Sequence, residues 1–159
     1  MHDDGSMHTP RFLSLLNRGW KPELQSIEIA TALQIPSFHI VGLPGPEVAE
    51  ARERVRAAIQ ASGVEFPRRR IVVNLSPASV RKQGTGLDLA LALAILWDDA
   101  AVDAEAPCRS WVVWGELGLD GSLKPAGQLT RLALAAWEAG AGFLLVSAAE
   151  EKDLRSRLA

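Results

Sequence analysis

The sequence has few residues of the kinds that build disulfides and metal centres. Cys108 is its only cysteine, so neither an intrachain disulfide nor a cysteine-based metal site is possible. The three histidines, His2, His8 and His39, lie far apart, and no H-E-x-x-H motif occurs. These absences exclude a disulfide scaffold and disfavour a zinc enzyme. We expect no metal site and a reducing, cytoplasmic environment.

Membrane-spanning segments and secretion signals are missing as well. The longest apolar run, residues 89–97, is well short of the roughly 18–20 residues that a membrane-spanning helix needs. We interpret the polar opening "MHDDGSM", residues 1–7, as an expression scar and exclude it from the fold. The remaining residues, 8–159, have the length of a single domain. We expect this domain to have no contact with membranes.

Nucleotide-binding motifs are the third absence. No stretch supplies the P-loop spacing G-x-x-x-x-G-K-[ST], and Leu89 replaces the third glycine of a dinucleotide-binding fingerprint. We therefore expect no cofactor in this chain and no ATP hydrolysis by it alone. The loop of residues 84–86 either holds an anion at the helix start or is a tight turn before a packed helix, which we favour. A third hypothesis makes Thr85 a nucleophile, with Lys82 close in sequence.

Hydrophobic periodicity, glycine and proline indicate alternating strands and helices. Pro46 suits the first position of a helix that Gly63 ends, and Asp120-Gly121 is typical of a hairpin turn. The segment 86–97 is apolar on all sides, which predicts a helix inside the domain. The predicted strands are 23–33, 36–44, 70–75, 110–119, 122–125 and 142–146, and the predicted helices are 45–63, 86–97, 127–140 and 148–159. This order predicts a mixed α/β domain with helices packed on a mixed sheet, and we place Trp97, Trp111, Trp114 and Trp137 in the core or an interface.

Positive charge is concentrated in one part of the chain. Residues 50–82 contain eight basic and three acidic residues, a net charge of +5, so the rest of the chain carries −7 of the total of −2. Clustered arginines hold phosphates through bidentate hydrogen bonds, which favours a nucleic-acid interface. The alternatives are a solvated face with internal ion pairs, such as Glu50 with Arg54, or a protein contact. The candidate phosphate-binding residues are Arg52, Arg56, Arg68, Arg69, Arg70, Arg81 and Lys82.

Several long motifs between residues 27 and 140 carry a family resemblance. In order, they read "IVGLP", "ERVRAAI", "FPRRRIVVNL" and "GELGLDGSL". They are similar to the wording of the ComM/YifB family of magnesium-chelatase-like proteins. The resemblance implies a fold like the Lon protease proteolytic domain, also seen in the second domain of a ribosomal small-subunit protein. The Lon serine falls on Gly86, beside Gly84 and Thr85, and the Lon lysine falls on Thr130, so the loop resembles an active site that has lost its dyad.

The same resemblance implies a role in a larger assembly. In the family, this domain precedes an AAA+ ATPase module, and members resemble hexameric motors that promote DNA branch migration during natural transformation. We therefore expect a non-catalytic accessory domain whose partners are DNA, an AAA+ module of the same or a related chain, and copies of itself. ATP and Mg²⁺ are expected only for a downstream AAA+ module. The sequence ends at Ala159 without an AAA+ motif, as an excised domain or a shortened protein. A protein-interaction scaffold and a remnant hydrolase remain alternatives.

Overall fold

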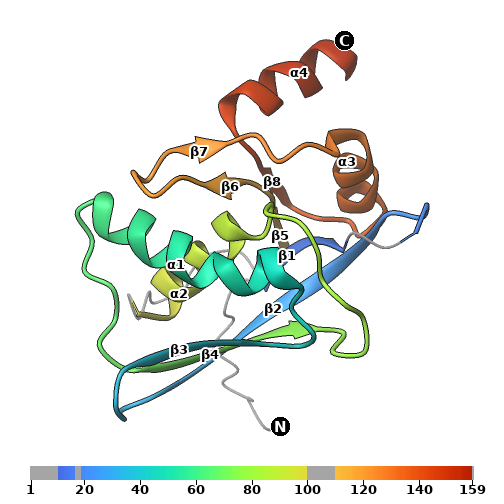
Figure 1. Cartoon of the computed structure of the whole chain (residues 1–159). Helices are drawn as coiled ribbons and strands as arrows, with labels where there is room; N and C mark the ends of the chain where they lie inside the picture. Colours follow the sequence, from blue (N-terminus) through green and yellow to red (C-terminus); the bar gives the residue numbers. More distant parts are fainter. Residues whose placement is uncertain (1–10, 17–18, 100–109, 159) are drawn as a thin grey trace, which may run out of the picture.

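The computed structural model describes residues 11–16, 19–99 and 110–158, so the segment 1–7 and Cys108 lie outside the described residues (Figure 1). The elements are β1 (Arg11–Leu16), β2 (Glu23–Ala32), β3 (Ser37–Val41), α1 (Pro46–Ala61), β4 (Arg70–Ser76), α2 (Asp88–Asp99), β5 (Ser110–Val113), β6 (Glu116–Leu117), β7 (Leu123–Lys124), α3 (Leu129–Glu138), β8 (Phe143–Leu145) and α4 (Ala148–Leu158). The predicted mixed α/β class is confirmed. No helix among these residues is long and apolar enough to cross a membrane.

Six of the strands form one mixed sheet in the order β3-β4-β2-β1-β5-β8. The pairs β1/β2 and β2/β4 are antiparallel, whereas β1/β5, β3/β4 and β5/β8 are parallel. Helix α1 supplies the crossover that the parallel neighbours β3 and β4 require. Because β4 lies between β2 and β3, the connection from β2 to β3 has to cross the end of β4.

Strand β1 is the element that the sequence analysis missed. It lies inside the sheet between β2 and β5, and residues 12–16 are all buried. A strand covered on both faces has no alternation of polar and apolar residues, so its pattern gives little sign of a strand. The one polar side chain among these residues, Ser14, donates a hydrogen bond to the Val113 carbonyl at 2.8 Å.

The predicted hairpin is present, but its first strand is divided. Residues 110–113 form β5 of the large sheet, and β6 starts only after Trp114 and Gly115. Gly121 has the positive φ of 85° that the turn needs, and the Gly118 amide donates to the Ser122 carbonyl at 2.8 Å. The division sends the chain from the large sheet to the separate β6-β7 hairpin, so Trp114 marks the junction between them.

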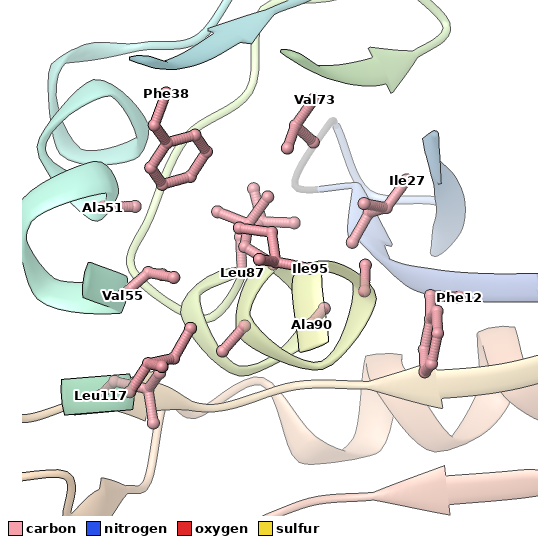
Figure 2. Close-up of a cluster of buried hydrophobic side chains, with 14 of the residues drawn as sticks. Phe12, Ile27, Phe38, Ala51, Val55, Val73, Leu87, Ala90, Ile95 and Leu117 are labelled. Atoms are coloured by element: carbon pink, nitrogen blue, oxygen red, sulfur yellow. The ribbon is translucent and has the colours of Figure 1, made fainter. Parts of the chain in front are cut away.

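Two apolar cores lie on opposite faces of the sheet. The first is enclosed by the sheet, α1 and α2, and Figure 2 shows Phe38, Val55, Val73 and Ile95 converging there. Helix α2 is central to this core, as its uniformly apolar sequence predicted. The second core packs side chains of β1 and β5 against α3. Of the tryptophans predicted in the core or an interface, Trp114 is fully buried, Trp97 and Trp111 are partly buried, and Trp137 is exposed.

Helix α4 is joined to the domain by a buried capping residue. Ser147 precedes the helix, and its hydroxyl accepts a hydrogen bond from the Glu150 amide at 3.3 Å. The Glu150 carboxylate accepts hydrogen bonds from the amides of Ala126 and Gly127 at 3.0 and 2.9 Å. These bonds fix the loop between β7 and α3, whose Gly127 carbonyl contacts Trp114.

Candidate nucleic-acid interface and the loop before helix α2

Five of the seven candidate phosphate-binding residues lie around one end of the molecule. Arg56 of α1 stacks over the Phe66 ring, with its guanidinium carbon 4.6 Å from the ring centroid. Phe66 in turn lies 5.7 Å from Phe38 of β3, ring centroid to ring centroid. The Ser37 amide at the start of β3 donates to the Arg69 carbonyl at 3.3 Å. These contacts connect α1 with the triplet before β4, and we call the set the arginine cluster: Arg52, Arg56, Arg68, Arg69 and Arg70.

The members of the arginine cluster differ in their ion pairs. Arg68 pairs with the exposed Glu65 at 2.6 Å, and Arg69 contacts Asp98 and Asp99 at 3.3 and 2.9 Å. These two arginines fit the prediction of a solvated, ion-paired face. Exposed pairs of this kind contribute only about 0–1 kcal/mol, so a phosphate competes with them at little cost.

The other three members of the cluster are exposed, and no ion pair to them is found within the part of the chain that the structure describes. Arg52 donates to the Ala49 carbonyl at 3.3 Å, and Arg70 reaches the Gln34 side-chain oxygen at 3.5 Å. Arg56 lies over Phe66. Their guanidinium groups are therefore available to an anionic ligand.

Arg81 and Lys82 lie apart from the cluster, at the start of α1. The amide of Gly45, which precedes α1, donates to the Lys82 carbonyl at 2.8 Å. Arg56 is ten residues along the helix from Pro46, about 15 Å at the helical rise. A Cβ on Gly45 would lie 3.7 Å from the Arg81 side chain, which is exposed. The sequence set therefore separates into two groups.

Lys82 does not face solvent, which corrects its nomination as a phosphate-facing residue. Its side chain has no exposed surface, and its ammonium group donates to the Pro77 carbonyl. Burial lowers the pKa of the Lys82 amine because the charged form loses hydration. The Lys82 amide also donates to the Leu43 carbonyl at 3.0 Å, so the backbone holds the side chain inward.

The glycine loop before α2 packs against Trp114. A Cβ on Gly86 would lie only 2.2 Å from the indole ring, so this position accommodates no side chain. The Gly115 amide donates to the Gly86 carbonyl at 2.8 Å, and the Leu89 amide donates to the Gly115 carbonyl at 3.1 Å. The Trp114 indole N–H donates to the Gly127 carbonyl at 2.9 Å. This geometry favours the tight turn over an open anion site.

The remaining residues of the predicted degenerate site do not meet in one place. Thr85 donates to the Glu116 carboxylate at 2.5 Å, while the Lys82 ammonium contacts the Pro77 carbonyl. Gly84 takes a φ of 87° in the turn. Thr130 is exposed near the start of α3, three residues beyond Gly127. Because Trp114 contacts both Gly86 and Gly127, its ring fills the space between the loop and the start of α3.

A buried ion pair beside this loop is the feature that the sequence analysis missed. Asp88 has no exposed surface, and Arg54 reaches its two carboxylate oxygens at 2.6 and 3.0 Å. Burial raises the pKa of Asp88, while Arg54 and the Leu117 amide, 3.2 Å away, oppose that rise. The hydrogen bond to Asp88 raises the pKa of Arg54.

The predicted pairing of Arg54 with Glu50 is minor, because those two groups are 3.9 Å apart. A carboxylate at the start of a helix that is apolar on all sides was the available signal, since such a group requires a partner when buried. The partner itself lies 34 residues away in sequence, which no local pattern identifies.

Comparison with known proteins agrees with the motifs. The family described as subunit ChlI of Mg-chelatase matches residues 27–150. The protein YifB of Salmonella typhimurium is 40% identical over 99 residues, which cover 62% of this chain and 19% of YifB. Competence protein ComM of Haemophilus influenzae is 36% identical over 111 residues, 70% of this chain and 22% of ComM.

An uncharacterized protein of Mycobacterium tuberculosis is 36% identical over 126 residues, which cover 79% of this chain and 25% of that protein. The chain thus spans about a fifth to a quarter of the length of the curated relatives it matches. The chain therefore belongs to the magnesium-chelatase-like family of subunit ChlI, together with its relatives YifB and ComM.

Proposed function

We propose that this chain is a non-catalytic accessory domain of a magnesium-chelatase-like AAA+ ATPase that acts on DNA. Its family and the similarity to a protein named for competence support this role. In this proposal an AAA+ module binds ATP and Mg²⁺, and the assembly forms a cytoplasmic ring, hexameric as in the motors that the motifs resemble. The domain contributes DNA phosphate contacts or contacts within the ring during branch migration in natural transformation.

The packing around Trp114 supports a Lon-like fold without protease chemistry. A nucleophile at Gly86 has no room, because any Cβ there collides with the indole ring. Thr130 has no amine with which to replace the lysine of the resembled dyad. Thr85, the nucleophile of the remnant-hydrolase hypothesis, is hydrogen bonded to Glu116. These observations favour a scaffold over a hydrolase.

The observation that carries DNA contact is the group of exposed arginines without ion pairs. Arg52, Arg56 and Arg70 come from α1 and β4 and lie in the arginine cluster. If each neutralises one phosphate of duplex DNA, log Kobs falls with log salt concentration at a slope of roughly −3, from about −0.9 per phosphate. This slope separates phosphate contacts from apolar or hydrogen-bonded contacts.

The test is a titration of the chain against short single-stranded and duplex DNA at several salt concentrations, with fluorescence anisotropy as the readout. We expect binding that weakens steeply as salt rises. A variant with Arg155→Gln and Arg157→Gln is a matched control, because these arginines of α4 are also exposed but pair with Glu151 and Asp153. If no binding is detected even at low salt, direct DNA contact is wrong, and ring assembly or partner docking remains.

A protein-interaction scaffold is the second candidate, and two exposed indoles favour it. Trp137 of α3 is 85% exposed and Trp20 is 90% exposed. Large aromatic side chains on a surface are typical of protein contacts. Sedimentation of the chain without DNA tests this candidate, since a scaffold for ring assembly self-associates and Trp137→Ser then weakens the association. A monomer at every concentration counts against it.

A further inference from the structure

The connection between β2 and β3 ends in an exposed apolar tip. Leu33 is 96% exposed and Ile35 is 87% exposed, and Pro36 follows them. We call residues 33–36 the apolar arch. The β6-β7 turn, in contrast, has Asp120 and Gly121 at its tip. Single exposed aliphatic side chains are common, but two at the end of one projecting connection are a candidate contact surface.

The register of the sheet places the arch over an arginine. Arg70, the first residue of β4, is opposite Ala32 of β2 and also opposite Ser37 of β3. The four residues of the arch therefore cross the end of β4 directly above Arg70. Figure 1 shows this connection projecting past β4 at the lower left of the molecule.

Hydrogen bonds hold the arch at both ends. The Gln34 amide donates to the Ala32 carbonyl at 2.9 Å, and the Arg70 guanidinium reaches the Gln34 side-chain oxygen at 3.5 Å. The Ser37 amide donates to the Arg69 carbonyl at 3.3 Å. The exposed aliphatic side chains thus start from a backbone that is fixed on the arginine triplet.

The charge around the arch favours a polyanion over a neutral partner. Residues 30–39 contain no acidic residue, and Arg68, Arg69 and Arg70 directly precede or form the strand below the arch. Arg56 is joined to the same end of the fold through Phe66 and Phe38. Proteins that insert aliphatic side chains between base steps combine such an apolar wedge with cations on the neighbouring phosphates.

We propose that the apolar arch is a wedge that enters DNA at the open end or branch point of a duplex. Leu33 and Ile35 contact the exposed base faces, and Arg70 and Arg56 bind the flanking phosphates. The proposal rests on the DNA contact proposed above and adds the structure that the domain recognises: an interrupted base stack. A continuous duplex offers the arginines phosphates but gives the arch no open base face.

The experiment compares a branched DNA and a continuous duplex of equal length, each with 2-aminopurine beside the branch point or at the equivalent internal position. The variant combines Leu33→Ser with Ile35→Ser, and Leu119→Ser is the control because Leu119 is 64% exposed on the β6-β7 hairpin. Thermal unfolding verifies that each protein is folded. Fluorescence reports unstacking, and anisotropy at several salt concentrations gives affinity and slope.

We expect the unaltered chain to increase 2-aminopurine fluorescence only in the branched DNA and to bind that DNA more tightly. The double variant should lose the increase and about tenfold in affinity for branched DNA, with its salt slope unchanged because the slope counts phosphate contacts. Leu119→Ser should behave like the unaltered chain.

Three results overturn the wedge. If the chain binds both DNAs with a steep salt slope and the double variant behaves identically, the wedge is wrong while DNA contact stands. If the chain binds neither DNA at low salt, the proposed function fails and the wedge with it. If the double variant instead abolishes self-association in sedimentation and leaves DNA binding unchanged, the arch is a protein contact.

Discussion

Arginines and carboxylates are arranged differently in two regions of this chain. Beside the loop before α2, Arg54 is joined to the fully buried Asp88, and Thr85 is joined to Glu116. In the arginine cluster, Arg56 lies only two residues beyond Arg54 on α1, yet it is exposed over Phe66. Two positions on a helix differ by about 200°, so neighbouring arginines serve opposite faces.

The difference shows where the molecule has capacity for a ligand. The loop region, where the Lon resemblance placed a nucleophile, satisfies its polar groups internally and is filled by Trp114. The arginine cluster leaves three guanidinium groups free of ion pairs among the described residues. We therefore expect substitutions in the loop region to change stability and substitutions in the cluster to change binding.

The largest expected effect is the loss of the buried ion pair. Asp88→Ala leaves Arg54 without its main partner and the Leu117 amide without an acceptor, which should lower the free energy of unfolding by about 3–5 kcal/mol. Urea denaturation measures this change. Glu50→Gln is the control, because Glu50 is 3.9 Å from Arg54 and exposed, and its effect should stay below about 1 kcal/mol. Equal effects of the two substitutions contradict the account.

The next effect concerns the space beside Gly86. Gly86→Ala forces a methyl group into the Trp114 ring and should lower the free energy of unfolding by about 1–3 kcal/mol. The double substitution Gly86→Ala with Trp114→Leu opens that space, so it should cost less than the sum of the two single substitutions. Strict additivity in urea denaturation shows that the collision is not the cause.

Within the arginine cluster, the expected effects are on binding rather than folding. Arg70→Gln should weaken DNA binding and reduce the magnitude of the salt slope by about 1, because one phosphate contact is lost. Arg69→Gln should have a smaller effect, since Asp98 and Asp99 already occupy its guanidinium group. Anisotropy titrations at several salt concentrations measure both, and the reverse order of effects contradicts the assignment.

The smallest expected effect is at the exposed pair of Arg68 and Glu65. The double substitution Arg68→Gln with Glu65→Gln should change the free energy of unfolding by less than about 1 kcal/mol. Urea denaturation at low and high salt measures it. A larger loss that disappears at high salt indicates that this pair stabilises the domain more than an exposed pair should.

Local sequence signals predicted much of the fold. Pro46 begins α1 and Gly63 follows its end with a positive φ of 79°, and Gly121 forms the hairpin turn. These residues act through their own backbone preferences, so neighbouring residues are enough to recognise them. β1 was missed because burial on both faces removes the alternation that marks a strand.

The candidate site was harder to predict, because charge counting carries no direction. Lys82 is adjacent to Arg81 and belongs to the same basic segment, yet it is buried while Arg81 is exposed. The backbone hydrogen bonds of Lys82 with Leu43 and Gly45 cause this difference, and they join segments almost 40 residues apart. Long-range pairing of this kind decides which arginines and lysines reach solvent.

The central claim is that exposed arginines of the cluster bind DNA phosphates, and the salt slope tests it most directly. The measurement is the slope of log Kobs against log salt concentration for duplex DNA, for the unaltered chain and for the combined Arg52→Gln, Arg56→Gln and Arg70→Gln variant. We predict a slope of roughly −3 for the unaltered chain and a slope near zero for the variant, from about −0.9 per phosphate. An unchanged slope in a folded variant would contradict the claim.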